Sequence, residues 1–389
     1  MAKERQARRA KKADNFFDYT LLFTVLFLVV FGLVVLYSVS SYDGTLKHGD
    51  NAYFLKKQLL ATGLGMVALV MAIVVDYHFI CKFAPAIYGI SVLLIFLIWT
   101  PLGRTINGAR RWLYFGGISV QPAEIVKVAV IVFLSVLIAG IGTSIKDIRS
   151  FFVILAFAAV PAALLLWITR NLSSALIVGG IAAVILFMAD PDYLKYFGLA
   201  ALAVIVALFF VLFSLHKAES AEGTGDFRQN RIVAWLHPED FEEETSFQTI
   251  QALYAIGSGG TFGKGLGESI QKYKIPEAQN DMVFAIICEE LGAFGGVCVL
   301  GLFGLLIYRC MLIAINAPDT LGSLLVAGVM GHFALQVILN IAVVTNTIPN
   351  TGVTLPFISY GGTSVIFLLI EIGLVLNVSL RIRKQEQIA

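Results

Sequence analysis

Ten long apolar runs constrain the fold of this chain more than any other feature. They lie near residues 19–39, 59–75, 84–99, 122–141, 151–168, 174–189, 196–215, 282–307, 321–344 and 364–380. A membrane-crossing helix uses about 20 predominantly apolar residues. Only 14% of the 389 residues are charged, against roughly 25% in a soluble domain. We therefore predict an all-α polytopic membrane protein with about ten transmembrane helices.

The charges outside these runs predict the topology. Basic residues crowd the first 17 positions, and a second basic cluster, Arg381, Arg383 and Lys384, follows the last run. The first run is too long for a cleaved signal peptide. An even number of crossings and the positive-inside rule place both termini in the cytoplasm. We expect cytoplasmic tails at 1–17 and 381–389, helices 1–7 within 18–216, a large extracellular loop at 217–280 and helices 8–10 within 281–380.

Charge and cysteine content exclude two classes of function. The formal net charge is +2, so there is no global basic field to attract nucleic acid. Four cysteines lie in or beside apolar runs without Cys-x-x-Cys spacing, and we expect them to be small core side chains rather than a disulfide or metal site. These are Cys81, Cys288, Cys298 and Cys310.

The large loop contains a helical pattern. Thr245 and Gln248 have the spacing of a capping box, and apolar residues then recur at helical intervals from Phe247 to Ile256 before Gly257. We predict an amphipathic helix here, either on the outer membrane surface or packed on the bundle.

Three arginines, Arg104, Arg110 and Arg111, lie in the external loop after the third run, where the positive-inside rule disfavours them. Guanidinium groups suit phosphate oxygens, and Trp112 and Tyr114 can lie beside them at headgroup level. The loop thus has two interpretations, a site for a phosphate-bearing lipid or general anchoring to headgroups.

Acidic residues near the ends of two apolar runs are also unusual. Glu124 and Lys127 share a helical face and either neutralise each other or line a polar cavity below the arginines. Asp281 begins a membrane helix, where it either caps the helix or acts as a general base. Glu289 and Glu290 follow two turns later, and at least one should face the interior of the bundle.

Glycine-rich and polar segments complete the set of candidates. The segment 257–267, GSGGTFGKGLG, contains Lys264 and is either an anion-binding loop or a flexible hinge, and it lacks the Walker pattern. Residues 351–364 form a polar external loop that contains Ser359. We expect the polar residues of the last two runs to make interhelical hydrogen bonds rather than to carry chemistry. They are His332, Gln336, Asn340 and Glu371.

Several of these motifs, taken together and in this order, resemble the SEDS family of shape, elongation, division and sporulation proteins. They are NGARRW with QPAEIVK, then GSGGTFGKGLG, IPEAQND followed by EELG, and TLPFISYGGTS. The stretch GLGESIQK and Ala278 look more like the division and sporulation branch, that of FtsW, than the elongation branch. Asn171 and Asn280 depart from the family pattern, in which aspartate and threonine are common at these positions.

The resemblance implies a peptidoglycan glycosyltransferase in the bacterial plasma membrane. Its substrates would be lipid II, an undecaprenyl-pyrophosphate-linked disaccharide pentapeptide, and the growing lipid-linked glycan. Its partners would be a class B penicillin-binding protein and divisome membrane proteins. No organic cofactor is expected, and a divalent cation, Mg²⁺ or Mn²⁺, is compatible with the pyrophosphate, although the sequence offers no obvious all-protein cage.

The resemblance also assigns residues. The family's essential aspartate falls on Asp281, which we expect to be catalytic. We expect substrate contacts from Arg104, Arg110, Arg111, Trp112, Glu124, Lys127, Lys264 and Ser359. Two alternatives stay open: a lipid II flippase that uses Glu124, Lys127 and Glu371 in mid-membrane, and a non-catalytic division scaffold.

Overall fold

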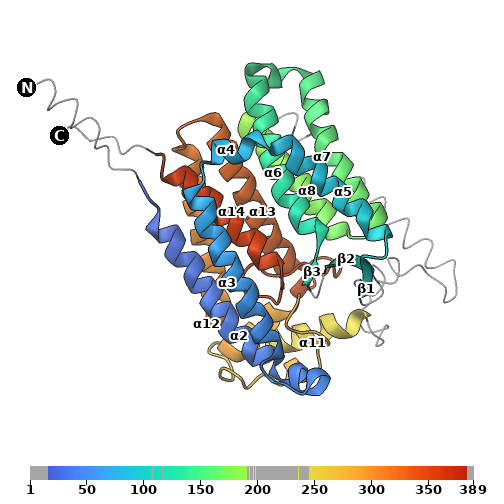
Figure 1. The fold of residues 1–389 in the computed structure, drawn as a ribbon. Helices are drawn as coiled ribbons and strands as arrows, with labels where there is room; N and C mark the ends of the chain where they lie inside the picture. Colours follow the sequence, from blue (N-terminus) through green and yellow to red (C-terminus); the bar gives the residue numbers. More distant parts are fainter. Residues whose placement is uncertain are drawn as a thin grey trace, which may run out of the picture.

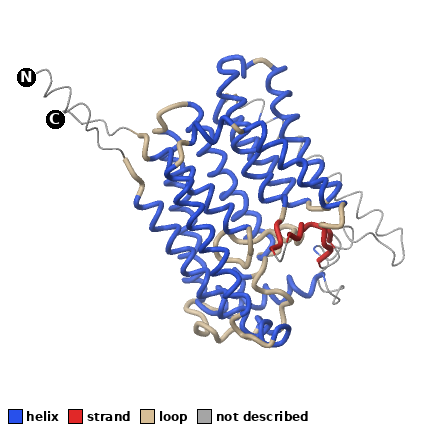
Figure 2. The backbone as a smooth tube through the Cα atoms, viewed as in Figure 1, coloured by secondary structure: helices blue, strands red, loops and turns tan. Residues whose placement is uncertain are grey.

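The computed structural model describes residues 16–106, 109–115, 118–190 and 245–382, together with residues 192, 196, 198 and 235. Long helices run side by side, with α13 and α14 between α2, α3 and α12 on one side and α5, α6, α7 and α8 on the other (Figure 1). α3 packs along α14, and α13 packs along both α12 and α8. Figure 2 shows that helix dominates the described chain.

The helices follow the apolar runs of the sequence. In chain order they are α2 (Tyr19–His48), α3 (Tyr53–Val74), α4 (Tyr77–Lys82), α5 (Ala84–Phe96), α6 (Pro122–Ile141), α7 (Ile148–Ile168), α8 (Leu172–Ala189), α11 (Thr245–Ser258), α12 (Val283–Ile315), α13 (Thr320–Val344) and α14 (Ser364–Ser379). Short 3-10 helices lie at η1 (Leu97–Trp99), η2 (Gly142–Lys146) and η4 (Gln271–Tyr273).

The predicted membrane helices are present wherever the structure describes the chain. Within the described residues, seven helices are long and apolar enough to cross a membrane, and two shorter apolar helices lie at Ala84–Trp99 and Ser364–Ser379. The predicted seventh run, 196–215, lies outside the described residues apart from two positions. The tails 1–15 and 383–389, and the loop from 217 to 244 except for Trp235, also lie outside them. The polytopic helical fold is thus confirmed, and this chain is a multi-pass membrane protein.

The first and last described residues lie together. The Phe16 N–H donates to the Ile382 carbonyl at 3.1 Å, and the Arg309 guanidinium contacts the Asp18 carboxylate at 2.7 Å. Asp18 in turn caps α2 by accepting from the Leu21 N–H at 2.9 Å. The two ends of the described chain therefore share one end of the bundle.

A small β-sheet, which we did not predict, forms at the opposite end of the bundle from α4 (Figure 1). Strands β1 (Gly103–Ile106), β2 (Ala109–Phe115) and β3 (Ile118–Val120) pair antiparallel in the order β1-β2-β3. Leu113 on β2 is fully buried and anchors the sheet on the bundle. Side chains alternate between the two faces of a strand, so the sheet also decides which arginines face inward.

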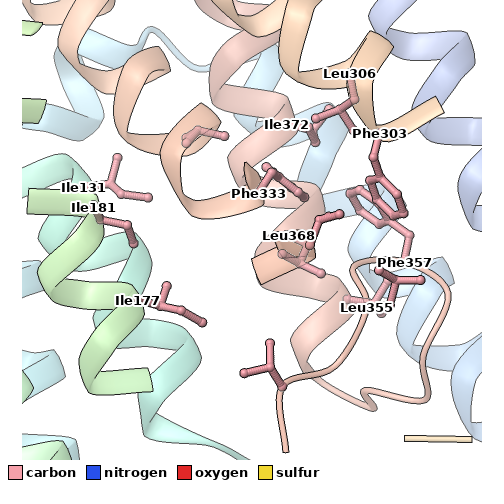
Figure 3. Close-up of a cluster of buried hydrophobic side chains, with 14 of the residues drawn as sticks. Ile131, Ile177, Ile181, Phe303, Leu306, Phe333, Leu355, Phe357, Leu368 and Ile372 are labelled. Atoms are coloured by element: carbon pink, nitrogen blue, oxygen red, sulfur yellow. The ribbon is translucent and has the colours of Figure 1, made fainter. Parts of the chain in front are cut away.

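A core of buried hydrophobic side chains extends from α6 and α8 through α13 and α14 to α12 and the polar loop before α14 (Figure 3). Phe333 and Phe357 stack with ring centroids 5.4 Å apart, so an aromatic pair ties α13 to that loop. Cys81, Cys288 and Cys310 are buried as expected, but Cys298 is exposed on α12, and the prediction of a core position was wrong for it. The predicted helix in the large loop is present as α11.

Candidate functional site

The glycine-rich loop packs into α12 and breaks it. Gly292 has φ +70°, outside the helical region, in the middle of that helix. The N–H groups of Lys264 and Gly265 donate to the carbonyls of Glu289 and Glu290 at 3.0 and 2.9 Å. A side chain at Gly263, where φ is +81°, would overlap the Glu290 carbonyl. These two N–H groups are thus used within the protein, and the backbone of the loop contacts α12. Both interpretations of this segment, anion-binding loop and flexible hinge, stay predictions.

Glu289 holds this loop with its side chain as well. Its carboxylate lies 2.6 Å from the Lys264 ammonium, and it also accepts from the Ser269 hydroxyl and from the N–H groups of Ile270 and Gln271. Glu289 is fully buried. Lys264, which we predicted to contact substrate, therefore has an internal partner, and its side chain is 29% exposed.

Glu290 forms a second buried pair beside the first. Its carboxylate lies 3.7 Å from the Lys272 ammonium and accepts from the Ser38 hydroxyl of α2 at 2.7 Å. Both glutamates face the interior, as predicted for at least one of them. Their cationic partners lie 25 and 18 residues earlier in the chain, so sequence spacing could not identify these pairs.

Asp281 lies just outside α12. That helix begins at Val283 with Met282 in the N-cap position, so the alternative role of Asp281 as the N-cap is contradicted. The residue is partly exposed. A Cβ atom built on Gly352 would lie 3.9 Å from the Asp281 Oδ2 atom. The carboxylate therefore faces the polar loop that precedes α14, across a glycine that leaves room beside it.

The three arginines of the sheet have different partners. Arg110 donates to two carbonyls near the start of its own hairpin, Thr100 at 2.7 Å and Gly103 at 3.2 Å. The Arg104 guanidinium lies 4.1 Å from the centre of the Tyr114 ring. These two side chains are exposed and support the sheet itself.

Arg111 lies two positions before the buried Leu113 on β2, where side chains two apart share a face, and the β1–β2 register shifts at this point, between Arg104 and Thr105. Its guanidinium donates to the carbonyls of Thr169 and Arg170, at 3.2 and 2.9 Å, in the connection between α7 and α8. Arg111 thus hydrogen-bonds to another segment of the bundle. Trp112 is partly buried, opposite Arg104 in the sheet.

Hydrogen bonds link the Arg111 region to the Asp281 region. Ser173, in the first turn of α8, donates to the Thr351 carbonyl, and Thr351 precedes the Gly352 that faces Asp281. The start of α8, which directly follows the connection that binds Arg111, is thus joined to the loop before α14, residues 345–363. Two residues that we singled out 170 positions apart are brought to the same end of the molecule.

Glu124 and Lys127 form a buried ion pair at the start of α6. The ammonium and carboxylate are 2.8 Å apart, and the two side chains are only 2% and 9% exposed. The predicted mutual neutralisation is confirmed. The pair lies at the end of α6 that adjoins β3, near the arginine-bearing sheet.

Ser359 and the polar residues of the last two helices have internal partners. The buried Ser359 hydroxyl accepts from the Leu355 N–H at 2.8 Å. His332 and Glu371 form a buried pair at 2.7 Å that joins α13 to α14, as predicted for interhelical bonding. Gln336 donates to the Thr354 carbonyl at 3.0 Å. Asn171, one of the departures from the family pattern, caps α8 by accepting from the Ser174 N–H at 3.1 Å.

A known protein family matches most of this chain. The family model for FtsW, RodA and SpoVE, described as cell cycle protein, matches residues 19–384. This chain belongs to that family. The family is the SEDS family indicated by the sequence motifs, and the match covers every described helix.

Individual members of the family are similar over nearly the whole length. Stage V sporulation protein E of Bacillus subtilis (strain 168) is 37% identical over 366 residues, which is 93% of this chain and 96% of that protein. A protein of Geobacter metallireducens named probable peptidoglycan glycosyltransferase FtsW is 35% identical over 370 residues, 94% of this chain and 96% of its own.

A solved structure shares the fold. It comes from a study titled "Structural coordination of polymerization and crosslinking by a peptidoglycan synthase complex" and has a TM-score of 0.77 at 29% identity, over 95% of this chain and 99% of that one. Within the residues of the present chain that the structure describes, no group of three His, Cys, Asp or Glu side chains is placed to hold a metal ion.

Proposed function

We propose that this protein is a peptidoglycan glycosyltransferase that polymerises lipid II. The placement of Asp281 carries the proposal: a partly exposed carboxylate just outside α12, beside a glycine and next to a loop that is hydrogen-bonded to the Arg111 region. Relatives that are 35% identical and named probable peptidoglycan glycosyltransferase support the same reaction.

In the proposed mechanism Asp281 is the general base. It takes the proton from the 4-hydroxyl of the N-acetylglucosamine of an incoming lipid II, and that oxygen attacks C1 of the N-acetylmuramic acid at the end of the growing chain. The C1–O bond to undecaprenyl pyrophosphate breaks, so the new β-1,4 bond forms with inversion. A general base contributes about 10²- to 10⁴-fold, so positioning and charge stabilisation of the leaving group supply the rest.

Arg111 is the residue we assign to the pyrophosphate, because its guanidinium is directed into the bundle at the end where Asp281 lies. A guanidinium suits phosphate oxygens. Arg104, Trp112, Glu124, Lys127, Lys264 and Ser359 stay predicted substrate contacts, whereas Arg110, which binds carbonyls near the start of its own hairpin, is expected to contribute little. A divalent cation would accompany the pyrophosphate itself.

We further propose the cellular setting. The end of the bundle with α4 and with the first and last described residues faces the cytoplasm, in agreement with the basic clusters that adjoin these residues in the sequence, and the end with the sheet and α11 faces outward. The partner is a class B penicillin-binding protein within the divisome, which fits the coupling of polymerization and crosslinking named for the similar structure. The division branch is the assignment supported by the FtsW relatives.

The proposal is tested with purified lipid II, the protein and its partner transpeptidase. Asp281→Asn should abolish glycan product without lowering the melting temperature. Asp50→Asn is the matched control, because Asp50 is paired with the exposed Lys56 at 2.7 Å, at the far end of α2 from the termini, and it should polymerise normally. Full product from Asp281→Asn, or lipid II translocation into liposomes without polymer, would contradict the glycosyltransferase mechanism.

A further inference from the structure

One buried side chain holds the backbone at Asp281. Asn340 on α13 is fully buried. Its Nδ2 group donates to the Asp281 carbonyl at 2.8 Å and to the Val353 carbonyl at 2.7 Å. These two carbonyls belong to segments about 70 residues apart, so this single amide joins the start of α12 to the loop before α14.

The orientation of this amide follows from its surroundings. Two carbonyl oxygens within hydrogen-bonding distance require the NH₂ side of the group, because an amide oxygen there would meet two other acceptors. On its other side, Asn340 Oδ1 has no donor among the described residues. The two donated bonds are therefore the polar interactions that fix this side chain.

The two carbonyls lie beside the place where the Asp281 carboxylate faces Gly352. Asp281 carries the carboxylate, and Val353 follows Gly352, the residue that this carboxylate faces. One turn of α13 earlier, Gln336 holds the next carbonyl, that of Thr354, at 3.0 Å. α13 thus presents a rigid edge against which the Asp281 backbone and the 351–355 segment are both fixed.

We propose that Asn340 is a positioning residue for the glycosyl transfer, which rests on the proposed role of Asp281 as the base. By fixing both backbones, Asn340 sets the distance between the Asp281 carboxylate and the 351–355 segment. Its effect is on the rate of the chemical step, because a misplacement of about 1 Å at a reacting group can cost on the order of 10²-fold in rate.

The test compares two variants of Asn340 with one matched control. Asn340→Ala removes both donors, and Asn340→Leu removes them while filling the space. Asn377 on α14 is the control, since it is also buried and its Nδ2 also donates to backbone carbonyls, those of Ala72, Ile73 and Val75 at 2.6–2.9 Å, near α4 at the other end of the bundle. Lipid II polymerisation is measured with the partner transpeptidase, together with melting temperature.

Both Asn340 variants should lower kcat by about 10- to 100-fold with KM for lipid II changed by less than about threefold, whereas Asn377→Ala, at a temperature where it is folded, should keep its kcat within about twofold. An equal kcat loss in Asn377→Ala, recovery in Asn340→Leu, a change confined to KM, or failure of the Asn340 variants to fold would overturn the inference. If Asp281→Asn is inactive in the same assay, such a result rejects the role of Asn340 alone. If Asp281→Asn polymerises normally, the base assignment falls as well.

Discussion

The Lys127 ammonium lies 2.8 Å from the Glu124 carboxylate one turn earlier on α6, and neither side chain is more than 9% exposed. Two opposite charges removed from water in this way depend on each other, because either one alone would be an uncompensated buried charge. The pair therefore predicts different results for single and double substitutions.

Lys127→Met should destabilise the protein by about 3–5 kcal/mol, since it leaves the Glu124 carboxylate buried without its partner. Glu124→Gln combined with Lys127→Met should recover most of that loss, which thermal melting in detergent will show. Lipid II polymerisation then separates two roles: recovery of stability without activity indicates substrate contact. If the double variant is as unstable as Lys127→Met, the pair is not the cause.

Gly263→Ala should destabilise the protein because the new methyl group overlaps the Glu290 carbonyl. Gly260→Ala is the matched control: Gly260 also has positive φ, +58°, but a Cβ there meets no other atom within 4 Å. The control should cost only the backbone strain, about 1–2 kcal/mol, and Gly263→Ala several degrees of melting temperature more. Equal melting temperatures would show that the close approach to α12 is not required.

Arg111→Lys keeps the charge but loses the fork that reaches Thr169 and Arg170. We expect about a tenfold fall in kcat/KM for lipid II, on the order of 1.4 kcal/mol. Arg110→Lys is the comparison, because Arg110 binds carbonyls at the start of its own hairpin and should change the rate by less than about twofold. A larger effect at Arg110 would assign the substrate contact to the exposed face of the sheet.

Low pH should destabilise the end of the bundle that holds α4. Burial disfavours the charge of Asp319, but hydrogen bonds from the Gly322 N–H, Tyr77 and His78 outweigh burial and lower the pKa of this carboxyl below its usual 3.8. A lowered folded-state pKa means that the contribution to stability is present above the unfolded value and lost as pH falls through the folded one. The melting temperature should drop below about pH 4, and less so in Asp319→Asn. An identical acid profile for both proteins would contradict this.

Much of the fold could be predicted because membrane crossings need long apolar segments, and each such segment can be recognised in the sequence independently of the others. The Glu124–Lys127 pair was equally accessible, since residues three apart share a helical face. The sheet was not, and simple alternation along β2 would not have separated Arg111 from Arg110, because the β1–β2 register shifts between Arg104 and Thr105.

The loop contacts of the site could not be predicted for a different reason. The sequence GSGGTFGKGLG does not indicate that its N–H groups donate to the carbonyls of Glu289 and Glu290, some 25 residues later. Gly292, a glycine inside the apolar segment that forms α12, lies at this contact but does not by itself identify the partner. The partners of Asn340 are likewise main-chain carbonyls, which every residue has, so no side-chain pattern identifies them.

The break at Gly292 has a consequence for where the hydrocarbon layer ends. At about 1.5 Å per residue the segment 293–315 is roughly 34 Å long, enough by itself to cross a hydrocarbon layer of about 30 Å. The turns of α12 before Gly292 can therefore lie outside the hydrocarbon layer. Glu289 and Glu290 can then lie outside the hydrocarbon layer, and so can Asp281, the proposed base, which precedes them.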